Sequence, residues 1–244
     1  MRRFFAPPEN FIDGNITLGL EETRHLRDVL RLHDGDQASV FDGNGREFLC
    51  TIGKISKSES ALSIVAEISP AAPESPLELN LAAAILPGEK FDLVVQKAVE
   101  LGIVTFQPLY TKRCEARPAG SGRRLARWKK IALEAAKQSG RAKLMTVAEP
   151  AQIADFLSQC SIGKTDDDGL ILFSERSGTG FSGLKENRKI TAVIGPKGGW
   201  EDSELDLARE NGFSIVTFGG RILRAETAAI AMAAILQHRF GDIY

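Results

Sequence analysis

Apolar and polar positions follow two different patterns along the 244 residues of the chain. Before residue 70, short runs with strand-like alternation are separated by Asp-Gly and Asn-Gly turns. One helical stretch lies among them at Glu21–Arg31, where Leu26, Val29 and Leu30 recur at helical spacing. Many short strands with a single helix predict a small β-barrel. The predicted strands are 15–18, 37–41, 47–55 and 61–68.

After the segment SPAAPESP at 69–76, predicted strands and helices alternate. This segment is rich in Pro, Ala and Ser, which is typical of a domain boundary. Strands are predicted at 79–86, 103–109, 144–147, 170–173, 190–194 and 214–218, and helices at 90–101, 121–139, 151–160, just after residue 200 and at 225–239. This alternation predicts a parallel sheet with helices on both faces. We therefore divide the chain into a domain at 1–70, a linker at 71–77 and a domain at 78–244.

Two glycine-rich loops near the C-terminus each connect a predicted strand to a helix. The strand 190–194 precedes GPKGG at 195–199, and the strand 214–218 precedes GGRILR at 219–224. Loops at the carboxyl ends of neighbouring parallel strands share one crevice, and glycine lets the backbone approach a ligand closely. Neither loop has the G-x-G-x-x-G or G-x-x-x-x-G-K-[ST] pattern, so a nucleotide phosphate is not favoured. From the loops alone, a ligand site and a pair of tight turns both remain open.

Taken together, IGPKGG at 194–199 and GGRILRAETA at 219–228 resemble two motifs of the bacterial 16S ribosomal RNA uridine-N3 methyltransferases. That family has IGPEGG and LGxRILRTETA in these places. Lys197, Gly219 and Ala225 depart from the motifs, which have Glu, an apolar residue and Thr there. The Thr hydroxyl that is missing here could cap the final helix.

This resemblance implies the SPOUT superfamily of S-adenosylmethionine-dependent RNA methyltransferases. Matches extend from Arg3 to Thr227 and cover nearly the whole chain. The implied fold is α/β, with a SPOUT-type parallel sheet and a deep trefoil knot, preceded by a small PUA-like β-barrel that binds RNA. Connections in proteins are normally not threaded through loops, so only the resemblance predicts the knot.

The resemblance also implies that the two loops bind S-adenosylmethionine as cofactor. A glycine-lined crevice can bind adenosine through backbone hydrogen bonds while apolar side chains enclose the adenine. The expected cofactor-binding residues are Leu172, Phe173, Ile194, Gly195, Pro196, Gly198, Gly199, Phe218, Gly219, Gly220, Ile222, Leu223, Thr227 and Ala228. No metal is required, and Cys50, Cys114 and Cys160 are too far apart in the sequence to suggest a metal site.

Methyl transfer to uridine N3 has two requirements. N3 lies on the Watson-Crick edge, so the base must be unpaired or flipped out, and its proton must leave. The candidate catalytic residues are Arg224 and Glu226, beside the expected methyl donor. The guanidinium could stabilise negative charge on O2 or O4, and the carboxylate could orient Arg224 or accept the proton. Alternatively, the two side chains pair with each other and stabilise the loop.

The net charge of −1 means that any RNA-binding surface must be local. Basic residues recur on the predicted helix at 21–31 and form a dense run on the one at 121–139. Such runs are often solvated helix faces, and this alternative stays open. The resemblance favours contacts with RNA phosphates. The candidate RNA-binding residues are Arg2, Arg3, Arg24, Arg27, Arg31, Arg113, Arg124, Arg127 and Arg141.

The partners implied by the resemblance are 16S rRNA or the small ribosomal subunit, and a second copy of the chain in a homodimer. The apolar final helix, with Ile230, Ala233, Ala234 and Ile235, could form the dimer surface or interior core. Two other functions remain open: the same fold acting on another RNA or base, and a non-catalytic RNA-binding or ribosome-assembly factor. Because neither a signal peptide nor an apolar run of about 18 residues is present, we expect a cytoplasmic protein without a membrane partner.

Overall fold

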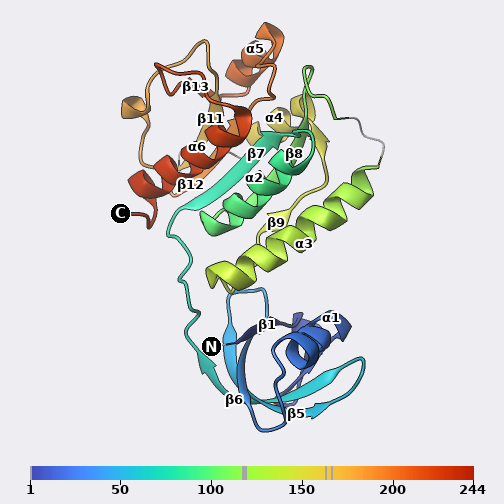
Figure 1. Cartoon of the computed structure of the whole chain (residues 1–244). Coiled ribbons are helices and arrows are strands. Elements are labelled where there is room, and N and C mark those ends of the chain that lie inside the picture. Colours follow the sequence, from blue (N-terminus) through green and yellow to red (C-terminus); the bar gives the residue numbers. More distant parts are fainter. Residues whose placement is uncertain (1, 117–119, 163, 166) are drawn as a thin grey trace. The chain divides into compact units, whose positions relative to one another are not determined.

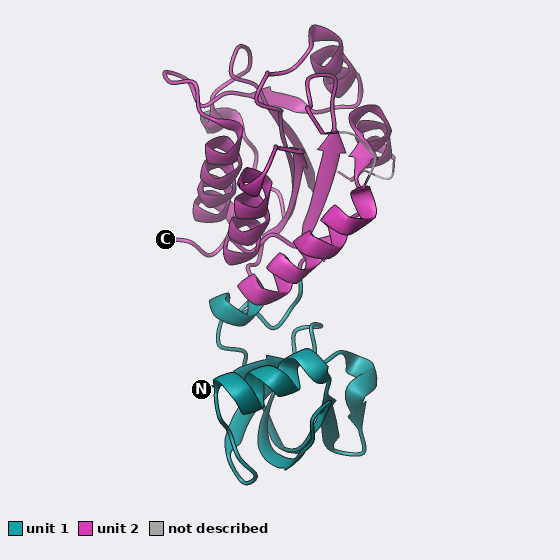
Figure 2. Cartoon of the chain, turned by 45° about the vertical axis from the view of Figure 1, so that its right-hand side comes forward, with its two compact units in different colours: residues 1–74, 136–144 teal, residues 75–135, 145–244 magenta. Residues whose placement is uncertain are grey.

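The computed structural model describes residues 2–116, 120–162, 164–165 and 167–244. The chain forms two compact units (Figure 2). The first comprises Met1–Glu74 and Ala136–Leu144, and the second comprises Ser75–Ala135 and Met145–Tyr244. From the sequence we expected two domains that follow one another along the chain. Residues 136–144 differ from this expectation, because they belong to the first unit.

The first unit is built on a six-stranded sheet with the strand order β1-β4-β5-β6-β3-β2. The strands are β1 (Arg3–Phe5), β2 (Phe11–Ile12), β3 (Asn15–Leu18), β4 (Gln37–Phe41), β5 (Glu47–Ile55) and β6 (Ser60–Ile68). β1 pairs with β4 in parallel, and the other neighbours pair antiparallel. Helix α1 (Leu20–Arg24) continues as a π-helical turn at His25–Val29, and Leu26 of this turn packs into the core of the sheet. The strands predicted at 15–18, 37–41 and 47–55 are confirmed.

Buried charged groups tie the segment 136–144 to the rest of the first unit. The Arg3 guanidinium donates to both Glu47 carboxylate oxygens, at 3.0 and 3.1 Å, and to the carbonyls of Ala136 and Arg141. Arg141 is 4% exposed and pairs with Glu74 at 2.6 Å. Because a buried charge is costly unless it is paired, these arginines serve the packing of this unit.

The second unit is built on a seven-stranded sheet in which every paired strand is parallel. Its main path has the order β10-β8-β7-β12-β11-β13, and β9 pairs with β8. The strands are β7 (Glu78–Ala84), β8 (Thr105–Tyr110), β9 (Thr146–Val147), β10 (Ala151–Gln152), β11 (Asp168–Phe173), β12 (Lys189–Ile194) and β13 (Ser214–Val216). The central strands β11 and β12 are almost continuously apolar, as expected for strands buried on both faces.

Helices cover both faces of this sheet (Figure 1). They are α2 (Glu89–Glu100), α3 (Ser121–Ser139), α4 (Ile153–Ser161), α5 (Asp202–Glu210) and α6 (Ala225–Phe240). α2 packs against α6, and α4 packs against α5. Leu157 of α4 and Leu205 of α5 share one hydrophobic core with Leu172 and Val193 of the sheet. The predicted parallel sheet with helices on both faces is confirmed. Within the described residues, no helix combines the length and apolarity needed to cross a membrane.

Candidate functional site

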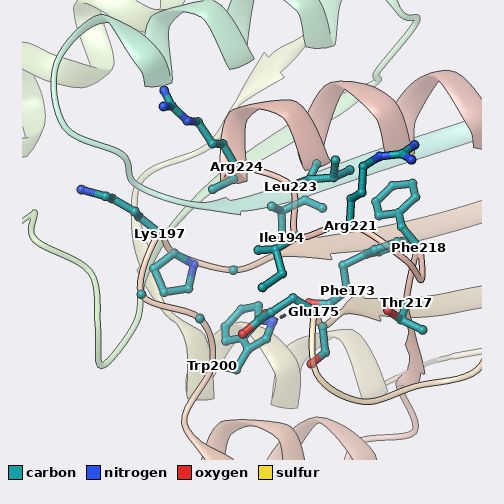
Figure 3. Close-up of a pocket in the computed structure, with 18 of the residues that line it drawn as sticks. Phe173, Glu175, Ile194, Lys197, Trp200, Thr217, Phe218, Arg221, Leu223 and Arg224 are labelled. Carbon is teal, nitrogen blue, oxygen red and sulfur yellow. Dashed lines mark hydrogen bonds between the residues drawn. The ribbon is translucent and has the colours of Figure 1, made fainter.

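A cavity of about 410 Å³ opens at the carboxyl ends of β11, β12 and β13 (Figure 3). The lining consists of residues 173–175 and 194–200, at the ends of β11 and β12 and in the loops after them, residues 217–224 of the loop after β13, and Ala225 and Ala228 of α6. Cavities of about 300–1,000 Å³ are typical of sites for small molecules and cofactors. The two glycine loops thus share one crevice, and the loop after β11 forms its third wall.

Trp200 lies at the base of the cavity (Figure 3). The indole is fully buried, and its Nε1 donates a hydrogen bond to the Phe173 carbonyl at 2.5 Å. A Cβ atom on Gly195 would lie 2.8 Å from the indole ring. Glycine at position 195 therefore makes room for the tryptophan.

Replacement of Gly195 by alanine is expected to lower the free energy of unfolding by about 1–3 kcal/mol, because the added methyl group overpacks against the indole. Gly198→Ala is the matched control, since its Cβ would approach Arg113 no closer than 3.3 Å, at the Arg113 Cβ, against 2.8 Å from the indole for a Cβ on Gly195. Urea unfolding of both variants measures the difference. Equal stability of the two variants would show that the indole does not restrict position 195.

Arg113 binds the first glycine loop, and Glu175 lies against it. The Arg113 guanidinium donates to the Gly198 carbonyl at 3.0 Å and to the Glu201 carboxylate at 2.6 Å. Gly199 has a left-handed φ of +72°, and a Cβ atom there would collide with a Glu175 carboxylate oxygen. Both the backbone conformation and the close carboxylate therefore require glycine at position 199.

Aromatic and aliphatic side chains surround one part of the cavity. The ring centroids of Phe173 and Phe218 lie 4.6 Å apart, and the ring of Phe181 lies 5.2 Å from each of them. The second glycine loop adds Leu223 and Ile222 to this lining. Ile222 is 84% exposed. An apolar surface of this kind suits a flat heteroaromatic ring.

The charged side chains that line the cavity are Glu175, Lys197, Arg221 and Arg224. Glu175 lies 3.4 Å from the neighbouring Arg176 guanidinium. The other three are exposed cations that form no ion pair with a residue that the structure describes. The rim of the cavity is therefore positively charged. In the described part of the chain, no group of three or more His, Cys, Asp or Glu side chains could hold a metal ion.

The structure separates the two predicted catalytic residues. Arg224 lines the cavity as the N-cap residue of α6, so Ala225 is the first helical residue and does not occupy the capping position. Glu226 does not line the cavity, and its carboxylate pairs with Lys90 of α2 at 3.1 Å. Burial raises the pKa of Glu226, but its backbone hydrogen bond, Lys90 and Arg224 outweigh burial and bring the pKa below its usual value. Glu226 is therefore ionised at neutral pH and accepts a proton poorly.

Comparison with known proteins identifies both parts of the chain. Residues 73–237 match the RNA methyltransferase domain, and residues 19–65 match the RNA methyltransferase PUA domain. The ribosomal RNA small subunit methyltransferase E of Synechocystis sp. is 35% identical over 240 residues, which cover 96% of this chain and 76% of that protein. The chain belongs to this family of RNA methyltransferases.

Solved structures of similar proteins share the fold over the full chain. The Neisseria gonorrhoeae ribosomal RNA small subunit methyltransferase E, bound to S-adenosyl methionine, is 31% identical with a TM-score of 0.90 and full coverage of both chains, 100% each. A Legionella pneumophila methyltransferase in complex with the same cofactor is 29% identical with a TM-score of 0.88, covering 98% of both chains. The α/β fold of the SPOUT type and the N-terminal PUA domain, both implied by the sequence resemblance, are confirmed.

Most residues expected to bind the cofactor lie around this one cavity. Those that line it are Phe173, Ile194, Gly195, Pro196, Gly198, Gly199, Phe218, Gly219, Gly220, Ile222, Leu223 and Ala228. Leu172 lies instead in the hydrophobic core, and Thr227 is an exposed residue of α6 outside the lining. Seven further residues line the cavity and were not expected as cofactor-binding residues from the sequence: Ser174, Glu175, Lys197, Trp200, Thr217, Arg221 and Ala225. Most of these directly adjoin an expected residue, so adjacency to the loops was the available signal.

The nine arginines expected to bind RNA fall into three groups. Two have side chains that are largely enclosed by the first unit: Arg3 is 9% exposed and Arg141 is 4% exposed. Four donate to other side chains: Arg27 to Asp28, Arg113 to Glu201, Arg124 to Tyr110 and Arg127 to Asp92. The remaining three are exposed, Arg2, Arg24 and Arg31. Only a cation at the surface can contact a phosphate, so burial removes Arg3 and Arg141 from the candidate RNA-binding surface.

Proposed function

We propose that this chain is an S-adenosylmethionine-dependent methyltransferase that methylates N3 of a uridine in 16S rRNA of the small ribosomal subunit. The observation that carries the proposal is the glycine-loop cavity with Arg224 at its rim, in a chain of this methyltransferase family. The similar proteins from Neisseria gonorrhoeae and Legionella pneumophila were crystallised with this cofactor.

The lining of the cavity fits S-adenosylmethionine. Phe173, Phe218 and Leu223 offer an apolar surface to adenine, and the loop backbones offer amide and carbonyl groups to the ribose and the base. Glu175 is the acidic residue of the lining and complements a cofactor that carries an ammonium and a sulfonium. When bound, the cofactor supplies an electrophilic methyl group.

Arg224 is the residue that we assign to the chemistry of the uracil ring. The target base enters the site flipped out of any duplex, because N3 is otherwise engaged in base pairing. The N3 proton passes to solvent water, and the guanidinium of Arg224 stabilises the negative charge that its loss leaves on O2 and O4. Glu226 has a positioning role, since its pair with Lys90 fixes the first turn of α6, directly after Arg224 at the N-cap position.

The exposed cations of the PUA unit extend the proposed RNA contacts. Arg24 and Arg27 border a shallow cavity with Lys57, and Arg2 and Arg31 are exposed residues of the same unit. In the second unit, Arg127 is an exposed residue of α3. Each phosphate contact adds to the salt dependence of RNA binding without specifying sequence.

The trefoil knot and the homodimer are further parts of the proposal. Both rest on the SPOUT-type fold. The four apolar residues named on α6 do not all have the same environment. Ala233 is buried in the core, whereas Ile230, Ala234 and Ile235 are partly exposed. These three support a dimer surface on α6. Sedimentation at micromolar concentration is expected to give a dimer, and a monomer would reject this assignment.

Calorimetric titration with S-adenosylmethionine and S-adenosylhomocysteine tests the cofactor site. Saturable binding of both is expected for the unaltered protein. Gly199→Trp is expected to abolish it, because the left-handed backbone and Glu175 leave no space for a side chain. Circular dichroism shows whether the variant is folded. If the unaltered, folded protein binds neither compound, the chain is a non-catalytic RNA-binding factor.

A further inference from the structure

Three cations around the cavity form no ion pair with a described residue: Lys197, Arg221 and Arg224. Other exposed arginines of the chain pair with a carboxylate, such as Arg46 with Glu67 and Arg209 with Asp206. The protein as a whole carries a net charge of −1, so the positive charge at the rim is a local excess. A rim of this kind favours an anionic ligand.

The cofactor accounts for only part of this charge. S-adenosylmethionine has a single carboxylate, and its ammonium and sulfonium are repelled by further cations. Arg224 is already assigned to the uracil ring. The cofactor carboxylate can therefore pair with only one of the two other cations, Lys197 or Arg221. RNA has one negative charge per nucleotide and supplies the remaining anions.

The two remaining cations lie on different loops and on different sides of the cavity. Lys197 belongs to the loop after β12, and Arg221 belongs to the loop after β13. In Figure 3 their side chains extend away from the cavity in opposite directions, with Arg224 between them. A nucleotide flipped into a pocket remains attached to the strand through one phosphate on each side.

We propose that Lys197 and Arg221 bind the phosphates on the two sides of the flipped uridine. This inference rests on the proposed methyltransferase function and adds the residues that position the RNA strand over the site. Lys197 stands where the related motif has Glu, so in this chain the first loop presents a cation to the strand in place of an anion. The contacts hold the nucleotide in position without reading its sequence.

Salt-dependent RNA binding by Lys197→Gln and Arg221→Gln variants tests the inference. The probe is a single-stranded oligonucleotide with a central uridine, titrated into protein saturated with S-adenosylhomocysteine. Each substitution is expected to reduce the slope of log K against log salt by about 0.7, the value for one phosphate contact to a single strand. Lys197→Arg should restore the slope, and the affinity for S-adenosylhomocysteine should not change.

Lys185→Gln is the matched control, since Lys185 is an exposed lysine of the same unit that does not line the cavity. An unchanged slope in the two rim variants would overturn the inference. So would a loss of cofactor affinity at an unchanged slope, which would assign the cations to the cofactor carboxylate. Failure of the unaltered protein to methylate RNA would reject the proposed function instead, while the binding slopes would still decide this inference.

Discussion

An Arg224→Gln variant is expected to methylate RNA about 10²–10³-fold more slowly than the unaltered protein, because it removes a preorganised donor for the charge that develops on uracil. The affinity for S-adenosylhomocysteine is expected to remain, since the backbone and the apolar lining are unchanged. Single-turnover methyl transfer under cofactor saturation measures the loss. It separates a slower chemical step from weaker binding.

Glu226→Gln is the control for this experiment. Its carboxylate pairs with Lys90 and lies outside the cavity lining, so its loss should slow the reaction less than the loss of Arg224. A Glu226 variant as slow as the Arg224 variant would contradict a positioning role and favour direct participation of the carboxylate.

Replacement of Trp200 by alanine is expected to lower the free energy of unfolding by about 3–5 kcal/mol, the usual cost of removing a large buried aromatic side chain. Trp200 is fully buried, donates to the Phe173 carbonyl and accepts a hydrogen bond from Arg176 at its own carbonyl. The cofactor affinity should fall with the stability, because the indole lies at the base of the cavity.

Ile222→Ala provides the comparison for Trp200. Ile222 lines the same cavity but is 84% exposed, so its removal should change the stability by no more than about 0.5 kcal/mol. Urea unfolding of both variants gives the two values. A Trp200→Ala variant that unfolds at the urea concentration of the Ile222 variant would show that the indole is not part of the packed core.

The strands and helices were predictable because the physical signal for them is local. The predicted strands at 170–173 and 190–194 lie within β11 and β12, and the predicted helices at 90–101 and 121–139 correspond to α2 and α3. The predicted strand at 214–218 was too long, since β13 ends at Val216 and the chain then turns to place Phe218 at the cavity. The return of residues 136–144 to the first unit could not be predicted, because it depends on pairs such as Arg141 with Glu74, 67 positions apart in the sequence.

The position of the site was predictable, but the role of each residue was less so. The two glycine loops located the cavity, although β12 and β13, which they follow, are not neighbours in the sheet and lie on either side of β11. The sequence did not reveal that Gly195 serves Trp200 or that Glu226 pairs with Lys90, since both depend on contacts made only in three dimensions. The same holds for Arg3, which we expected to bind RNA. Its ion pair with Glu47 depends on the fold and could not be predicted from the sequence.

Methyl transfer from S-adenosylmethionine to small-subunit ribosomal RNA tests the central claim most directly. The RNA, isolated without this modification, is incubated with the protein and labelled cofactor, digested to nucleosides and separated. The account predicts that the label appears in 3-methyluridine alone and that the Arg224→Gln variant forms little of it. Label in another nucleoside, or no transfer by a folded protein that binds the cofactor, would contradict the account.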